Sequence, residues 1–130
     1  MKLNILCIGD VVGRPGRRIL AEKLKPLVKE LNVDCVIVNA ENAAGGSGLT
    51  PQIYNKLLRY GTNLITLGDH TYRKRDIIET LERADNIVRP ENFSTRCQQG
   101  VCFLQDRQRT SRCDSFFNRP NFYEAGRMSL

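Results

Sequence analysis

Histidine is nearly absent from this 130-residue chain: it occurs once, at His70. None of the five cysteines forms a CxxC pair, which argues against a structural zinc site. No apolar run approaches the roughly 18 residues of a membrane helix. The short N-terminal run "LNILCIGD" ends in an acid and does not look like a signal peptide. We therefore expect a cytoplasmic, reduced protein with no membrane partner.

Nucleotide-binding signatures are also missing. Two glycine-rich stretches, "GDVVGRPGR" and "ENAAGGSGLTP", lack both the Gly-Lys-Ser/Thr of a Walker loop and the G-x-G-x-x-G dinucleotide spacing. They fit either tight turns or a close backbone approach to an anion or metal. The net charge of +6 comes without a Lys/Arg block interleaved with aromatics, which argues against nucleic acid as a partner.

The first 90 residues alternate between two hydrophobic patterns. Apolar runs typical of strands occupy residues 2–9, 34–40 and 63–68, with a short fourth run at 86–90, and the first of these strands should be buried. Helical patterns lie between them, over residues 15–31, 50–61 and 73–85. The residues expected to face the core include Leu20, Leu24 and Leu31 in the first helix and Ile77 and Ile78 in the third. Thr50 should cap the second helix and Gly61 should end it. This alternation predicts an α/β fold with a mostly parallel sheet and flanking helices.

The composition changes near residue 94. Residues 94–130 hold six arginines and no lysine, whereas residues 1–93 hold all six lysines. We divide the chain into a partial domain at 1–93 and an atypical, irregular tail at 94–130. The tail is either an ordinary irregular segment or not the natural continuation of the domain, as after a frameshift or truncation.

Polar clusters follow three of the predicted strands: Asp10, the pair Glu41–Asn42, and the pair Asp69–His70. In an open parallel sheet, ligands bind at the carboxyl ends of the strands, so these clusters should converge on one cleft. Carboxylates crowded together repel each other unless cations lie between them. Oxygen ligands with an imidazole suit manganese, iron or zinc. Taken singly, an acid after a strand is more often a helix cap than a metal ligand, and a lone histidine is more often a surface or packing residue than a catalyst.

Five arginines flank the same edge and could attract a phosphate, although exposed arginines are often without such a role. They are Arg14, Arg17, Arg18, Arg73 and Arg75.

Three of these segments carry a family resemblance. "ILCIGDVVGRPGRR", "VIVNAENAAGGSGLTP" and "TLGDHTYRKRDI", followed by "IVRPENF", resemble the bacterial calcineurin-like metallophosphoesterases of the YmdB type, the 2′,3′-cyclic-nucleotide 2′-phosphodiesterase family. The resemblance covers residues 1 to about 93. It implies the N-terminal half of a metallophosphoesterase-type α/β sandwich with two divalent metal ions, iron or manganese.

The resemblance assigns a role to each site residue. Asp10 resembles a ligand of the first metal, Glu41 a carboxylate touching both metals, and Asn42 a ligand of the second. Asp69 stands where the family has a metal-binding asparagine, and His70 resembles the proton donor to the leaving group. "HTYRKRD" also replaces the usual "HTWD", which bears on the substrate pocket.

The expected function is hydrolysis of a small nucleotide or phosphodiester, impaired here because the family's later histidine ligands have no counterpart after His70. The alternatives are an inactive fragment and a metal-free remnant that binds phosphate or nucleotide. Half of a sandwich would expose one apolar sheet face, through which copies of the chain could associate.

Overall fold

The computed structural model describes residues 2–90, which fold as alternating strands and helices. The strands are β1 (Ile5–Ile8), β2 (Cys35–Asn39), β3 (Leu64–Thr66) and β4 (Ile87–Val88). The helices are α1 (Gly13–Glu30), α2 (Pro51–Tyr60) and α3 (Ile78–Arg83), and a 3-10 turn, η1 (Arg75–Ile77), leads into α3. The predicted α/β class is confirmed. The predicted tail at 94–130 lies outside the described residues.

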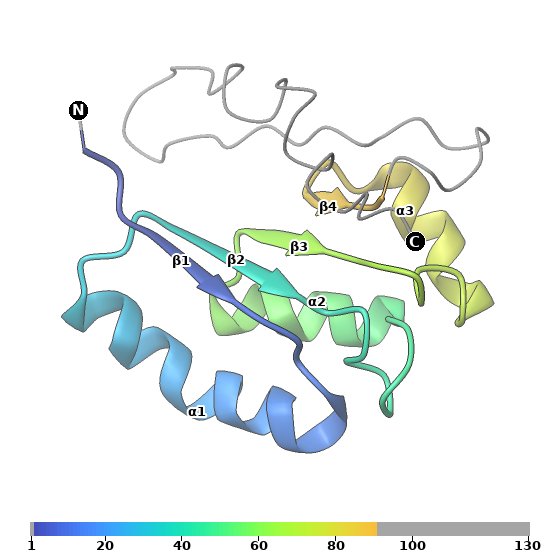
Figure 1. Ribbon diagram of the computed structural model, residues 1–130, viewed down its shortest axis with the longest axis horizontal. Coiled ribbons are helices and arrows are strands. Elements are labelled where there is room, and N and C mark those ends of the chain that lie inside the picture. Colours follow the sequence, from blue (N-terminus) through green and yellow to red (C-terminus); the bar gives the residue numbers. More distant parts are fainter. Residues whose placement is uncertain (1, 91–130) are drawn as a thin grey trace, which may run out of the picture.

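The strands form one parallel sheet in the order β1-β2-β3-β4 (Figure 1). Ile8 lies opposite Val38, and Asn39 lies opposite Thr66, which in turn pairs with Val88. Because all four strands run the same way, the loops that follow them leave from one edge of the sheet. The sheet therefore brings together the segments after β1, β2 and β3.

Helices α1 and α2 lie together on one face of the sheet (Figure 1). The main core lies between these helices and the strands, where side chains that alternate along each strand point to the same side. Its central members are each at most 2% exposed: Leu24, Val36, Val38, Leu57 and Ile65. This packing anchors β2 and β3, the two strands whose ends carry Glu41, Asn42, Asp69 and His70.

The opposite face of the sheet is less well covered. Leu64 and Val88 form a small second cluster with Ile37. On the edge strand β1, Ile5 is 45% exposed and Cys7 is exposed. The prediction that this first strand is buried is therefore wrong, because β1 has a neighbour on one side only and its outer residues face solvent.

The ends of α2 follow the sequence prediction. The Thr50 hydroxyl accepts a hydrogen bond from the Ile53 amide at 3.3 Å, and Pro51 occupies the first helical position. Gly61 ends the helix with a φ of 111°, a left-handed conformation that side chains disfavour. Local capping chemistry thus sets where this helix begins and ends.

Two details of the other helices differ from the prediction. Leu31 lies beyond the end of α1 and is 50% exposed, although Leu20 and Leu24 are buried as expected. The third helix is shorter than predicted, and Ile78 is 39% exposed while Ile77 is fully buried. Ile77 ends η1 and Ile78 begins α3, and side chains of consecutive residues here point about 100° apart, so the two isoleucines differ in exposure.

The longest helix, α1, has 18 residues and carries charged side chains along its length. Within residues 2–90, no helix is both long and apolar enough to cross a membrane.

Candidate active site

Backbone hydrogen bonds hold the loop after β1 against the loop after β2. The Val11 amide donates to the Asn39 carbonyl at 3.0 Å, and the Gly13 amide donates to the Asn42 carbonyl at 2.9 Å. These two bonds bring the side chain of Asp10 beside that of Asn42, 32 positions along the chain.

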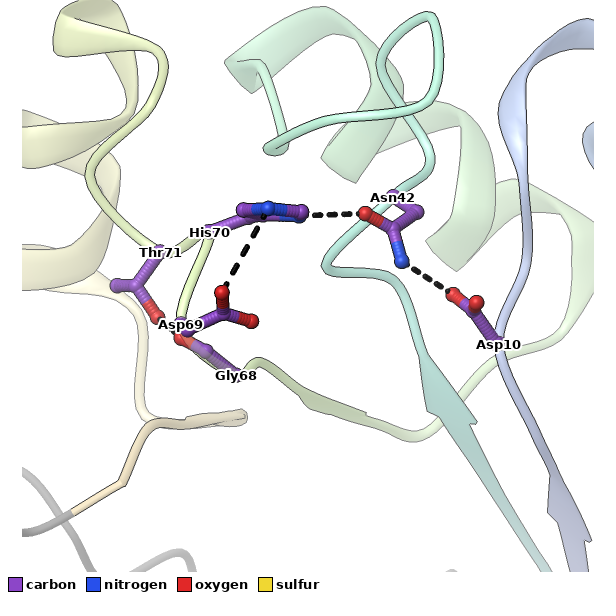
Figure 2. Close-up of polar contacts among 6 residues, drawn as sticks. All are labelled: Asp10, Asn42, Gly68, Asp69, His70 and Thr71. Atoms are coloured by element: carbon purple, nitrogen blue, oxygen red, sulfur yellow. Dashed lines mark hydrogen bonds and ion pairs between the residues drawn. The ribbon is translucent and has the colours of Figure 1, made fainter.

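Asn42 links all three strand ends (Figure 2). Its Nδ2 donates to Asp10 Oδ1 at 2.8 Å, and its Oδ1 lies 2.6 Å from His70 Nδ1. An ionised carboxylate only accepts hydrogen bonds, so Asp10 orients the amide nitrogen toward itself and the amide oxygen toward His70. The proton between Asn42 and His70 therefore sits on His70 Nδ1, and Nε2 is left for other partners.

The second nitrogen of the imidazole faces Asp69. His70 Nε2 lies 3.6 Å from Asp69 Oδ2, and the side chain of His70 is 26% exposed against 78% for Asp69. Asp69 thus lies at the rim of the site, while His70 is partly enclosed. Both residues follow directly from the end of β3 through Gly68 (Figure 2).

Glu41, in the loop after β2, packs against Gly68, which follows β3. A methyl group on Gly68 would overlap Glu41 Oε2 and lie 2.6 Å from its Cδ, so the missing side chain of Gly68 makes room for this carboxylate. Glu41 Oε2 is buried and has no hydrogen-bond partner. A buried carboxylate oxygen without a donor is unfavourable unless a cation is close.

Two of the five flanking arginines are engaged in contacts of their own. Arg17 donates from Nη1 to the Ala43 carbonyl, which ties α1 to the loop that carries Glu41 and Asn42. Arg18 pairs with Glu22 at 2.8 Å on the exposed face of α1. Arg14, Arg73 and Arg75 are exposed.

The structure therefore connects Asp10, Asn42, His70 and Asp69 in one chain of contacts and places Glu41 beside Gly68 at the same edge. Within the described part of the chain, however, no three or more His, Cys, Asp or Glu side chains gather closely enough to hold a metal ion. An amide, not an acid, occupies the central position. The atoms that could bind a metal are carboxylate and amide oxygens, including the unpartnered Glu41 Oε2. Oxygen ligands of this kind suit a hard divalent cation.

Sequence reasoning missed a contact next to His70. Arg89, which follows β4, is only 5% exposed and donates from Nη1 to the Tyr72 hydroxyl at 2.9 Å. The only sequence signal was an arginine directly after an apolar strand, in "NIVRP". Nothing in that local pattern indicates that the side chain reaches the loop after β3.

Comparison with known proteins places these features in a family. The family model of YmdB-like proteins matches residues 6–113. The chain belongs to this family. A 2′,3′-cyclic-nucleotide 2′-phosphodiesterase of Bacillus subtilis is 44% identical over 91 residues, which are 70% of this chain and 34% of that protein. The YmdB-like chain thus spans about a third of the length of the curated relatives it matches.

Solved structures agree with the family assignment. The crystal structure of a protein described as a novel phosphatase from Mycoplasma pneumoniae has a TM-score of 0.75 and 32% identity, over 82% of the YmdB-like chain and 40% of that protein. A hypothetical protein from Thermus thermophilus has a TM-score of 0.69 and 34% identity, over 78% and 39% of the two chains. The family model extends past residue 93, and the domain boundary predicted there stays a prediction.

Proposed function

We propose that the loops after β1, β2 and β3 form part of a metal-dependent phosphodiesterase site. Asp10, Glu41, Asn42 and Asp69 would hold divalent metal ions, iron or manganese, and His70 would act as proton donor. The observation that carries this proposal is Glu41 Oε2, a buried oxygen without a hydrogen-bond partner, next to Asn42 in the loop that meets Asp10. Such an oxygen is stabilised most directly by a cation.

Divalent ions at such a site polarise phosphoryl oxygens and activate water. The protein's own contribution lies in how it holds His70. Because Nδ1 is bonded to Asn42, Nε2 is the nitrogen that can give a proton to a departing oxygen, and it carries that proton when the imidazole is doubly protonated. The contact with Asn42 also fixes the plane of the ring, so proton transfer is aligned before substrate arrives.

The substrate class follows from the relative in Bacillus subtilis, whose name specifies 2′,3′-cyclic nucleotides. We propose a cyclic nucleotide or another small phosphodiester for this chain as well. The exposed arginines at the same edge, Arg14, Arg73 and Arg75, support an anionic substrate.

We further propose that residues 1–130 alone bind metal weakly and turn over slowly. The chain has one histidine, already bonded to Asn42, and fewer than three His, Cys, Asp or Glu side chains gather at any point within residues 2–90. Tight dinuclear sites need more ligands than these residues supply.

The test is to measure manganese and iron(II) binding and hydrolysis of 2′,3′-cyclic AMP by the purified chain under reducing, anaerobic conditions. We expect Glu41→Gln to weaken metal binding about tenfold or more, the range seen when metal-site support is removed. Glu22→Gln is the matched control, because Glu22 is an exposed carboxylate on α1 paired with Arg18. Metal binding that is equal in all three proteins would refute the proposed site, and fast turnover lost in His70→Ala would refute only the proposed impairment.

A metal-free phosphate- or nucleotide-binding module is the second candidate, favoured by the absence of a three-ligand cluster in the described residues. The same titrations distinguish it. Inorganic phosphate that binds equally well with and without a chelator, in a protein that binds no metal, would support this alternative. A chain that binds neither would be the inactive remnant.

A further inference from the structure

The segment that carries His70 has no regular secondary structure, so its position depends on its contacts with neighbouring elements. It leaves β3 at Gly68 and reaches η1 through turns and bends. Thr71 is fully buried, and its hydroxyl donates back to the Gly68 carbonyl at 2.6 Å (Figure 2). The Thr71 and Arg73 amides also donate to the Gly68 and His70 carbonyls, at 3.2 and 3.1 Å. These local bonds shape the turn, and contacts with other elements hold the turn in place.

The glycine-rich loop after β2 supports one side of this turn. Gly48 has a φ of 82°, and a methyl group there would lie 2.9 Å from the Lys74 side chain and 3.1 Å from that of Arg73. The close approach of the two loops therefore requires a residue without a side chain at position 48.

Arg89 supports the segment from the end of β4. Its guanidinium is buried, Nη1 donates to the Tyr72 hydroxyl at 2.9 Å, and Nη2 is buried without a partner. Burying a charged group with an unmet donor is unfavourable, so folding stability alone does not account for an arginine here. Proteins break such local rules mostly at functional sites. The Arg89–Tyr72 bond joins the end of β4 to the segment that holds His70.

We propose that Arg89 is a positioning residue that acts on His70 through Tyr72. The guanidinium fixes the tyrosine hydroxyl, the tyrosine fixes the turn after His70, and the turn keeps Nδ1 of His70 on the Asn42 amide. The role of Arg89 rests on the proposed function of His70 as proton donor, but the positioning itself can be measured without metal or substrate.

The test compares Tyr72→Phe with Tyr54→Phe in the metal-free protein at one fixed pH. Both changes remove a tyrosine hydroxyl that makes a side-chain hydrogen bond, since Tyr54 donates to Asn86 Oδ1 at 2.7 Å on another part of the fold. The readout is the rate at which diethyl pyrocarbonate modifies the single histidine, followed by mass spectrometry. We expect Tyr72→Phe to raise that rate about fivefold, the population change that corresponds to one hydrogen bond of about 1 kcal/mol.

Tyr54→Phe should lower the urea midpoint to a similar extent and leave the His70 rate unchanged. An equal rise in both variants would show a general loss of stability, and no rise in Tyr72→Phe would show that the bond does not hold the segment. Either result overturns the proposal. Arg89→Met provides a second measurement: combined with Tyr72→Phe it should add no further rise, because both changes break one bond.

The two proposals fail separately. If Tyr72→Phe frees His70 while the wild-type chain neither binds metal nor hydrolyses cyclic nucleotide, the positioning role stands and the proposed function falls. If the wild-type chain is an active metalloenzyme and His70 reacts alike in both tyrosine variants, the positioning role falls.

Discussion

Gly68→Ala should displace the Glu41 carboxylate from its place beside Gly68, just after β3. The added methyl group would overlap Glu41 Oε2 and lie 2.6 Å from Cδ and 3.2 Å from Oε1. The backbone of Gly68 is not in the left-handed region, so alanine is tolerated by the main chain and the clash with Glu41 is the main effect. The carboxylate must turn toward solvent, or β3 must shift away from β2.

The size of the effect follows from two opposing terms. Overpacking a filled site by one methyl group destabilises a protein by about 1–3 kcal/mol. Release of a buried oxygen that has no partner returns about 1–3 kcal/mol, so the net loss is smaller if Glu41 swings out freely. The interaction is isolated by Glu41→Ala, which removes the obstructing carboxylate. Gly68→Ala should be nearly neutral in that background, which gives a coupling of about 1–3 kcal/mol between the two positions.

Urea unfolding of the four proteins of this cycle measures the coupling. A loss of about 2 kcal/mol moves the midpoint by about 1 M at the slopes usual for small domains. Gly9→Ala is the matched control, since Gly9 also follows a strand and a methyl group there has nothing within 4 Å. If Gly68→Ala has the same cost with and without the Glu41 carboxylate, or the same cost as Gly9→Ala, the contact between Glu41 and Gly68 does not exist as described.

Two further predictions concern folding and association. Thr50→Ala should destabilise the chain by about 1 kcal/mol through loss of the α2 cap. Urea unfolding measures this loss, with Thr50→Ser, which keeps a hydroxyl, as the control. Equal losses of stability in the two variants would argue against the cap. Ile5→Lys should reduce self-association, because a charge on the exposed edge strand β1 opposes pairing with another copy. Light scattering over a concentration series tests it, with Ile19→Lys on the exposed side of α1 as control; the same behaviour in both variants would exclude β1 as the contact.

Local patterns predicted the fold well where neighbouring residues decide the conformation. Thr50, Pro51 and Gly61 define α2 through bonds and dihedral angles within a few residues of each other. The three clusters after the strands were also placed at one edge correctly, because parallel strands with helical crossovers leave little choice. Exposure was less predictable: Ile78 and Cys7 face solvent because of helix phase and sheet position, which no short window of sequence reveals.

The contacts within the candidate site also could not be predicted from short stretches of sequence. The Asn42 amide meets Asp10 and His70 across 32 and 28 positions, and the Arg89 guanidinium meets Tyr72 across 17. The residue types show which side chains can form hydrogen bonds. Which residue each one bonds to depends on the strand order, the register and the path of the loops. The sequence likewise did not indicate that Glu41 packs against Gly68 with its Oε2 atom buried.

The sequence by itself determined the α/β alternation, the strand ends that carry the acids, and the resemblance to the YmdB-like family, because each depends on short runs of residues. Only the tertiary structure decided that an amide bridges Asp10 and His70, that Gly68 leaves space for Glu41, and that Arg89 contacts the segment after His70. These three depend on ångström-scale distances between distant residues, which the packing of α1 and α2 against the parallel sheet sets.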